Sequence, residues 1–291
     1  MKMWLVILFF ICHTSAVQAA TYAVARSATP VLNTAAFSSV FGGTDGKSLK
    51  TDRCGQVREL EHIALPGTVF RILGERRVGV STVYQVDTDE YSVPDGISLY
   101  VDSRFVERRE AAPPHRSRPL PSRKSIVDAL RSTVGSPYVW GGNVQVGVAE
   151  LLEMFYRNPV PDRLKSRLVL AGLDCSGLLY QATGGGTPRN TSQLVSYGRP
   201  VPVTAKSAEA IVQILKPLDL IVWNGHVVIV LDHQSTIESR LECGKPGNGG
   251  VVITPLLKRL NEIMRTRRPV DQWEASRKRR DIFVVRRWIA E

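Results

Sequence analysis

Residues 173–180 read LDCSGLLY and predict a buried helix that carries a cysteine in its first turn. Leu178 and Leu179 fit one apolar face of that helix, and the three glycines at 184–186 end it. Cys175 then lies where unpaired N–H groups and the positive end of the helix dipole favour the thiolate form. A cysteine considered alone is more often a small buried residue. Cys175 is therefore a candidate nucleophile on the condition that a general base lies beside it.

His226 is the histidine that best fits the role of this base. It opens the expected strand His226–Leu231 directly after an Asn-Gly pair, so its imidazole can face a groove while the apolar residues enter the core. We expect His62 and His115 to be surface residues, because the first falls in a predicted barrel and the second in a proline-rich linker. A histidine at a strand start is by itself more often structural. The presence of a helix-start cysteine in the same chain favours the catalytic interpretation of His226.

An imidazole base needs a third group that fixes its tautomer and its orientation. If the strands on either side of residue 232 form a hairpin centred there, Glu238 lies directly opposite His226 on the same face of the sheet, with Cβ atoms ~5 Å apart. Two alternatives stay open: Glu238 is simply exposed, or His233 at the turn takes the orienting part.

The order of elements in the C-terminal half predicts an α+β fold with an antiparallel sheet, because helices come first and strands follow. Ser125 and Asp128 fit a capping box at the start of a helix that ends near Gly135. A second amphipathic helix is expected over residues 148–156. The expected strands are residues 220–223, 226–231, 251–254 and 282–285.

The N-terminal half reads as a small all-β barrel or sandwich over residues 47–110. Its expected strands are rich in β-branched and aromatic side chains and comprise residues 68–73, 81–86 and 99–106. Residues 20–46 carry no clear signal beyond possible strands. A linker at 111–122, AAPPHRSRPLPS, holds four prolines without apolar periodicity and separates this half from residues 123–291.

Residues 1–19 read as an export signal peptide: Lys2 precedes an apolar core, and small residues lead to a cleavage site before Ala20. The expected location is the periplasm or cell envelope. Export leaves three cysteines, an odd number, in a compartment that can oxidise thiols. We therefore hypothesise a disulfide between Cys54 and Cys243, motivated by export and by the need for Cys175 to stay free.

Five motifs occur in the order and spacing of one known family: YVWGG (138–142), DCSGLLY (174–180), TPRNTSQ (187–193), LKPLDLIVW (215–223) and GHVVIVL (225–231). Over about residues 123–288 the chain resembles the NlpC-type cysteine peptidases, which implies a papain-like α+β catalytic domain with helices packed on an antiparallel sheet. The stretches ALPGTVFRIL, VSTVYQV and LYVDSRFVE, within residues 64–107, resemble a bacterial SH3-like domain. An SH3-like barrel ahead of the catalytic domain is a familiar arrangement in that family.

The resemblance implies a secreted peptidoglycan hydrolase that cleaves the γ-D-glutamyl–diaminopimelate (or lysine) amide of stem peptides through an acyl-enzyme intermediate. Carried over by position, Cys175 is the nucleophile, His226 the base and Glu238 the third residue, where the family usually has His, sometimes Asn or Gln. The matching substrate-binding positions are Tyr138, Asp174 and Ser176. No metal or organic cofactor is implied. A second departure is the long insertion at 143–173, which forms either a wall of the groove or peripheral packing.

Composition limits the rival functions. The chain has 291 residues, 43% apolar and 22% charged, with a net charge of +11, which excludes wholesale disorder and a collagen-like repeat. The positive charge favours anionic partners: stem peptides, released muropeptides, wall polymer or an anionic membrane surface. Export and the absence of a nucleic-acid motif argue against nucleic acid. We expect a monomer. The alternative to an enzyme is a non-catalytic wall-binding protein that acts through the SH3-like domain.

Overall fold

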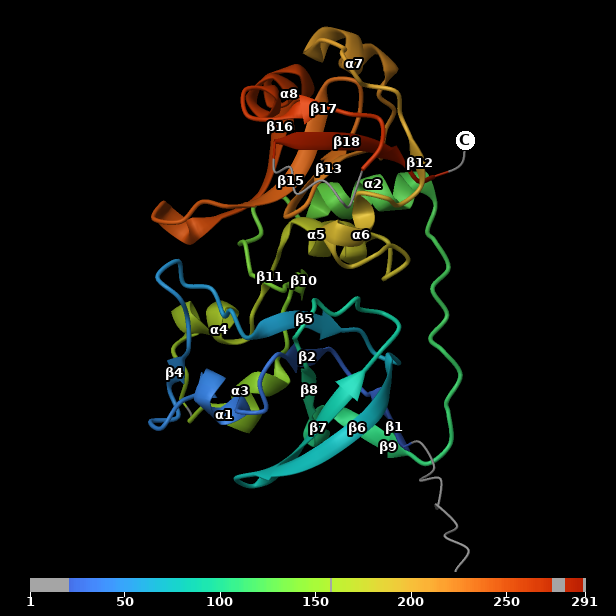
Figure 1. Ribbon diagram of the computed structural model, residues 1–291. Coiled ribbons are helices and arrows are strands. Elements are labelled where there is room, and N and C mark those ends of the chain that lie inside the picture. The colour runs from blue at the N-terminus through green and yellow to red at the C-terminus, as the bar shows by residue number, and fades with distance from the viewer. Residues whose placement is uncertain (1–20, 158, 274–280, 290–291) are drawn as a thin grey trace, which may run out of the picture.

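The computed structural model describes residues 21–157, 159–273 and 281–289 (Figure 1). The expected signal peptide, residues 1–19, and the basic run at 277–280 lie outside these residues. Within them the chain forms two seven-stranded sheets with helices packed around the second. None of the helices in the described ranges is long and apolar enough to cross a bilayer. The α+β prediction is confirmed.

The first sheet is antiparallel, with the strand order β5-β2-β8-β7-β6-β1-β9. Two of its strands lie in residues 20–46, where the sequence indicated no more than possible strands. Both are short, and both pair with strands farther along the chain. Asp102 breaks the expected strand 99–106 in two, since its side chain accepts from the Arg104 amide and starts a 3-10 turn. The strands are β1 Thr21–Ala25, β2 Thr29–Leu32, β5 Leu60–Ala64, β6 Val69–Val78, β7 Ser81–Asp87, β8 Leu99–Asp102 and β9 Val106–Arg109.

The expected closed barrel is not confirmed. Within the described residues no strand pairing joins β5 to β9, so the sheet is open at both ends. The outer edge of β5 is instead covered by a side chain from the C-terminal half. Asn143 accepts from the Ile63 amide (3.0 Å) and donates to the Ile63 carbonyl (2.7 Å), which satisfies the edge as a neighbouring strand would. The SH3-like character of this half remains a prediction.

The second sheet has the order β12-β18-β13-β14-β15-β16 and is antiparallel, with the short β17 added parallel to β18. Its central strands read as continuous apolar runs because both faces are covered. Helices α2 and α5 cover one face, and α7 and α8 cover the other (Figure 1). The strands are β12 Arg199–Pro200, β13 Leu220–Trp223, β14 His226–Val230, β15 Ser235–Leu241, β16 Gly249–Pro255, β17 Arg268–Pro269 and β18 Ile282–Arg287.

Polar side chains cap the first turns of helices α2, α5 and α7. Helix α2 starts three residues earlier than the predicted capping box, because the Ser122 hydroxyl accepts from the Ser125 amide (3.1 Å) and leaves Ser125 inside the first turn. The helices are α2 Arg123–Ser132, α5 Cys175–Ala182, α6 Thr191–Leu194, α7 Ala208–Ile214 and α8 Leu256–Met264.

The insertion at 143–173 packs on the N-terminal half. It carries β10 Asn143–Val144, α3 Glu150–Phe155, α4 Asp162–Leu168 and β11 Gly172–Leu173, so the helix expected at 148–156 is shorter than predicted. The Phe155 ring lies 5.5 Å from Phe41 and 6.4 Å from Phe37, next to helix α1 Phe37–Val40 and the strand pair β3 Phe41–Gly42 and β4 Ser48–Leu49. The apolar side chains of the insertion join the hydrophobic core of the first sheet.

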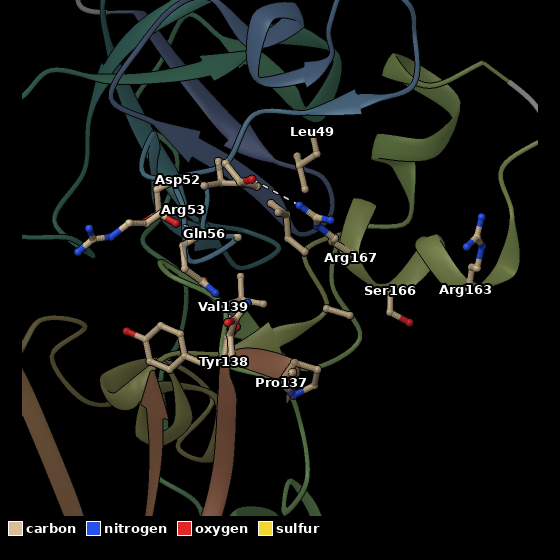
Figure 2. Close-up of a pocket in the computed structure, with 17 residues that line it drawn as sticks. Leu49, Asp52, Arg53, Gln56, Pro137, Tyr138, Val139, Arg163, Ser166 and Arg167 are labelled. Atoms are coloured by element: carbon tan, nitrogen blue, oxygen red, sulfur yellow. Dashed lines mark hydrogen bonds between the residues drawn. The ribbon is translucent and has the colours of Figure 1, made fainter. Parts of the chain in front are cut away.

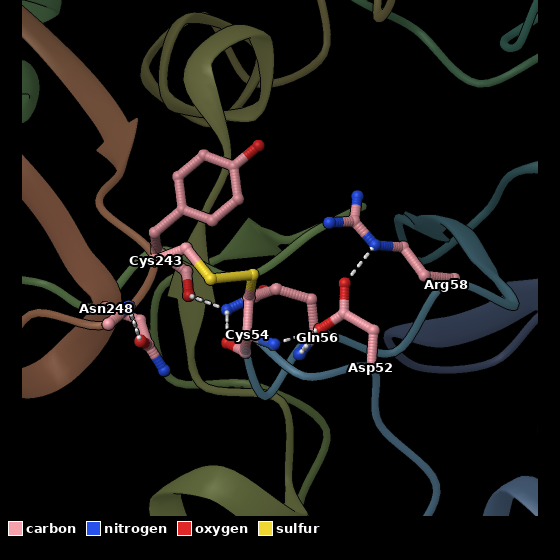
Figure 3. The surroundings of a disulfide bond; sticks show 8 residues. Asp52, Cys54, Gln56, Arg58, Cys243 and Asn248 are labelled. Atoms are coloured by element: carbon pink, nitrogen blue, oxygen red, sulfur yellow. Dashed lines mark hydrogen bonds and ion pairs between the residues drawn. A yellow bond between two sulfur atoms is a disulfide. The ribbon is translucent and has the colours of Figure 1, made fainter.

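A disulfide and the expected linker add to the contacts that join the halves. A disulfide connects Cys54 to Cys243, 189 residues apart in sequence, and confirms the hypothesised pairing (Figure 3). The expected linker also makes fixed contacts, since Arg116 donates to Glu90 (2.6 Å) and to the Gly184 carbonyl (2.9 Å). Tyr180 of α5 donates to the same Glu90 carboxylate (3.0 Å), so the linker, the first half and the cysteine-bearing helix meet at one carboxylate.

Replacing both Cys54 and Cys243 with serine should lower the free energy of unfolding by about 2–4 kcal/mol, because the bridge closes a long loop of the unfolded chain. Urea denaturation with and without reductant measures this. Reductant should destabilise the wild-type protein and leave the double variant unchanged. A wild-type protein whose mass does not rise by two hydrogens on reduction would show that the bridge is absent.

Candidate active site

The nucleophile candidate Cys175 is the first residue of α5, as predicted. Asp174 caps the helix, since its Oδ1 accepts from the Gly177 amide (2.6 Å). A side chain at position 177 would place its Cβ 2.0 Å from the Gly142 carbonyl oxygen, so glycine is required there for the helix to approach the YVWGG loop. The Cys175 thiol is free, is 7% exposed, and its sulfur lies 4.0 Å from the Gly225 carbonyl oxygen.

His226, the base candidate, is the first residue of β14 and pairs with Trp223 across the β13–β14 turn. The Trp223 ring packs 5.1 Å from the imidazole and limits its rotation. Burial alone would lower the pKa of His226, but hydrogen bonds and charge interactions with Cys175 and Glu238 outweigh it and raise the pKa to about 9. The ring is therefore protonated at neutral pH.

Glu238 contacts His226 as predicted, although the predicted register is wrong. The pairs Ile229–Ile237 and Val230–Thr236 centre the hairpin on residue 233 and place Glu238 diagonally across from His226. Nε2 of His226 lies 2.6 Å from Oε2 of Glu238, whose side chain is fully buried. The other candidate, His233, is exposed at the turn beyond the opposite end of β14.

The Glu238 carboxylate also has cationic partners that the sequence did not suggest. Arg259 of α8 lies with Nε 2.6 Å from Oε1 and donates from Nη2 to Oε2 at 2.8 Å, and Arg240 lies 3.9 Å from Oε1. Burial would raise the pKa of Glu238, but His226 and Arg259 outweigh that effect and hold it below its usual range. Glu238 is therefore an ionised, buried carboxylate.

Asp174 and Ser176, expected to bind substrate, lie together around a buried arginine. Arg189 is 2% exposed and donates to both oxygens of Asp174 (2.6 and 3.0 Å) and to the Ser176 hydroxyl (2.9 Å). Its Nε donates to Asn143 (3.1 Å), the residue that covers the β5 edge. Arg189 stands in the TPRNTSQ motif, and no sequence pattern distinguishes it from the other basic residues.

Tyr138 lies close enough to interact with both Asp174 and Cys175. Burial, followed by the negative charges of these two residues, raises the pKa of Tyr138 above its usual range. Its phenol therefore stays protonated and can donate a hydrogen bond. The backbone around it is fixed, since the Tyr138 amide donates to the Gly249 carbonyl (3.3 Å) and its carbonyl accepts from the Gln56 side chain (3.4 Å).

A cavity of about 550 Å³ opens beside Tyr138 (Figure 2). Its walls come from residues 49–57 of the first half, from α4 and the residues after it, and from the β15–β16 turn next to the disulfide. Arg167 donates to the Thr51 hydroxyl (3.4 Å) across it. Figure 3 shows Asp52 organising the same wall: its Oδ1 accepts from the amides of Cys54 (2.8 Å) and Gln56 (2.9 Å).

The surface position expected for His62 is wrong. Its side chain is 1% exposed, stacks on Tyr91 at 4.3 Å, and has no hydrogen-bond partner on either ring nitrogen. Burial, with the charge of Arg189, holds the pKa of His62 well below its usual value, so the ring is neutral. The sequence could not show this, because the neighbours of the ring, Tyr91 and Arg189, lie outside its strand and are brought to it by the fold. His115 is exposed in the linker, as predicted.

Comparison with known proteins gives structural neighbours at low similarity. No family model and no curated protein matches the chain. An NlpC/P60 family protein from Bacillus cereus is 17% identical with a TM-score of 0.31; the match covers 82% of this chain and 59% of that one. RipD from Mycobacterium tuberculosis, described as a non-catalytic NlpC/p60 domain protein adapted to peptidoglycan binding, is 19% identical with a TM-score of 0.30, over 46% of this chain and 92% of that one.

A third neighbour, NlpC2 from Trichomonas vaginalis, is 11% identical with a TM-score of 0.32, over 93% of this chain and 74% of that one. These neighbours are NlpC/P60 proteins, and the likeness is too low to carry an argument about this chain. The chain spans 59% of the length of the Bacillus cereus protein. What this site does is therefore argued from its own residues.

Proposed function

We propose that this chain is an exported cysteine peptidase that cleaves the γ-D-glutamyl–diaminopimelate (or lysine) amide of peptidoglycan stem peptides. The observation that carries the proposal is a cluster of three groups: the helix-start thiol of Cys175 interacts with the imidazole of His226, and Nε2 of that ring lies 2.6 Å from a buried carboxylate. This is the arrangement that a cysteine nucleophile requires. The substrate class and the papain-like fold rest on the five motifs that resemble the NlpC-type peptidases. The cell-envelope location rests on the expected signal peptide at residues 1–19.

The proposed reaction starts from a Cys175 thiolate and a protonated His226. The Cys175 thiolate attacks the amide carbonyl carbon and forms a thioester, and Nδ1 of His226 gives its proton to the departing amine as the C–N bond breaks. Water then attacks the thioester and His226 takes its proton, which regenerates the thiolate and the imidazolium. The amide of Cys175 has no intrahelical acceptor at its position and, with the Tyr138 hydroxyl, can stabilise the oxyanion.

Asp174 retains a role in binding the amino end of the peptide. Its Oδ1 accepts from the Gly177 amide, Ser176 and Arg189, whereas Oδ2 has Arg189 as its hydrogen-bond partner. Oδ2 carries fewer hydrogen bonds than Oδ1, so it can receive one ammonium donor as well. Ser176 then acts by holding Arg189 and Asp174 in place.

Product analysis with defined muropeptides tests the proposal. The purified protein is incubated with the tripeptide L-Ala-γ-D-Glu-diaminopimelate and with the same peptide attached to N-acetylmuramic acid, and the products are identified by mass spectrometry. We expect L-Ala-D-Glu and free diaminopimelate from the first substrate. Absence of cleavage in both, or cleavage at another bond, would exclude this activity.

Glu238→Gln should lower kcat by about 10- to 100-fold and leave KM within about twofold, because Glu238 contacts the base and not the substrate. The amide keeps the size of the side chain but removes the charge that stabilises the imidazolium. Glu242→Gln, just beyond the same strand, is the matched control, since Glu242 pairs with Lys245 and Arg240 away from the imidazole. Equal kinetics for the two variants would show that Glu238 has no orienting role.

A non-catalytic, wall-binding protein is the alternative, and the low exposure of Cys175 favours it. In that case stem peptides, wall polymer or an anionic membrane surface would be bound through the +11 net charge without turnover. Iodoacetamide labelling separates the two. An active thiolate reacts near neutral pH, whereas an inert thiol reacts near its unperturbed pKa of about 8.5. We propose a monomer with no nucleic-acid partner and no cofactor in either case.

A further inference from the structure

Arg259 approaches Glu238 from the face of the sheet opposite to the cysteine helix. Leu256, Leu260 and Ile263 anchor α8 in the core on that face, and Arg259 projects toward β15 with its side chain 14% exposed. Its guanidinium meets both oxygens of Glu238, at 2.6 and 2.8 Å. The carboxylate is therefore held between the imidazole on one side and the guanidinium on the other.

The charge balance around Glu238 changes during the proposed reaction. When His226 is protonated, its charge compensates the buried carboxylate directly. Once His226 has given its proton to the leaving amine, Glu238 would remain as a buried anion, which is costly unless another cation compensates it. A guanidinium is always charged in proteins, so Arg259 compensates Glu238 in both states of the imidazole.

We infer that Arg259 is a positioning residue of this site, which keeps Glu238 ionised and directed at Nε2 of His226 so that Nδ1 faces Cys175. The inference rests on the proposed function, in that the orienting role matters for a Cys-His reaction. A fully buried carboxylate accepts a proton when its cation is removed, and a protonated Glu238 no longer stabilises an imidazolium.

Other charged groups also lie near His226, Glu238 and Arg259 and contribute to the electrostatic potential there. Arg240 of β15 lies 3.9 Å from Glu238, and Glu262 of α8 accepts from Arg259 at 3.2 Å. Arg267 stacks on Trp223 at 4.5 Å, next to the imidazole. Arg259 is the cation with two close contacts to Glu238, so its removal should have the largest effect on the ionisation of that carboxylate.

The test compares four variants: Arg259→Met, Arg259→Lys, Glu238→Gln, and Glu238→Gln combined with Arg259→Met. Lys258→Gln is the matched control, because Lys258 is the preceding residue of the same helix, is exposed, and its loss removes the same charge. The readout is the rate of iodoacetamide alkylation of Cys175 against pH, measured on the Cys175 peptide by mass spectrometry. This readout needs no substrate. The pH profile of kcat/KM is measured as well wherever cleavage occurs.

We expect the acid limb of the Arg259→Met alkylation profile to move to higher pH by about one unit or more, which makes alkylation below the limb about tenfold slower. The sign follows from the low pKa of Glu238: without Arg259 the carboxylate takes up a proton at a higher pH. Arg259→Lys should shift the limb less. In the Glu238→Gln background, Arg259→Met should add no further shift, since Arg259 acts through that carboxylate.

A profile for Arg259→Met that coincides with Lys258→Gln would overturn the inference, as would an equal shift in the Glu238→Gln background. If Arg259→Met does not fold, Arg259→Lys decides: a shifted limb supports the inference and an unshifted one overturns it. A wild-type protein that cleaves no muropeptide while the alkylation limb still moves would end the proposed function and retain the positioning role. A wild-type protein that cleaves the muropeptide, with no shift of the alkylation limb in Arg259→Met, would retain the proposed function and end the positioning role.

Discussion

Cys175→Ala should abolish release of diaminopimelate from the stem tripeptide, with kcat/KM falling on the order of 10⁴-fold or more. The sulfur forms the covalent intermediate in the proposed reaction, so no other group of the site can replace it. Fixed donors such as the Cys175 amide remain in the variant and account for any residual rate. The measurement is product release at saturating and at low substrate, followed by mass spectrometry.

The fold should survive this change. Cys175 packs in the core of the second half, and shortening it to alanine removes one sulfur atom, which costs about 1 kcal/mol of unfolding free energy. A urea curve therefore separates lost chemistry from lost structure. Cys175→Ser is the second variant: it keeps the volume and a weaker nucleophile, and should retain the fold with activity close to that of the alanine variant. Product release at the wild-type rate from either variant would assign the chemistry to another residue.

The start of α5 is the part of the site that the sequence predicts most fully, because its determinants are local. Asp174 caps the helix, Cys175 opens it, and Gly177 permits the close approach of the Gly142 carbonyl, all within one turn. Strand β14 could also be predicted from its continuous apolar run, which is typical of a strand buried on both faces. Elements of this kind can be predicted without knowing which distant residues they contact.

The contact between His226 and Glu238 was predicted with the wrong register and still occurs. The centre of the hairpin moved by one residue, which shifts the partner of each position by two and leaves every side chain on the same face of the sheet. Glu238 became a diagonal neighbour, and diagonal neighbours remain within reach of long side chains. A shift by one position would have turned Glu238 to the opposite face.

Arginines with buried roles could not be identified from the sequence. The chain has 38 Lys and Arg residues, and which of them enters the interior depends on a carboxylate that the fold brings to it. Arg189 pairs with Asp174, which stands in another of the five motifs. Arg259 on α8 pairs with Glu238 on β15. The same reason explains why residues 20–46 indicated only possible strands and why Asn143 was not predicted at the edge of β5, since the partners lie far along the chain.

Arg189→Met should lower the free energy of unfolding by about 3–5 kcal/mol, the second large effect that we expect. The side chain makes five hydrogen bonds, to Asp174 twice and to Ser176, Asn143 and the Gly142 carbonyl, while 2% exposed. Methionine fills most of the volume but leaves Asp174 without its cation. Because Asp174 also caps α5, the loss reaches the helix that presents Cys175.

Arg131→Met is the matched control, because Arg131 pairs with Asp232 at the surface with both side chains over 40% exposed, and such pairs contribute about 0–1 kcal/mol. Urea denaturation of both variants measures the contrast. Combining Arg189→Met with Asp174→Asn distinguishes the cause: the double variant should be more stable than Arg189→Met alone, since it removes the uncompensated buried charge. If the double variant is instead less stable by the sum of both changes, the guanidinium stabilises the fold through packing and its neutral partners, and the charge of Asp174 is already balanced elsewhere.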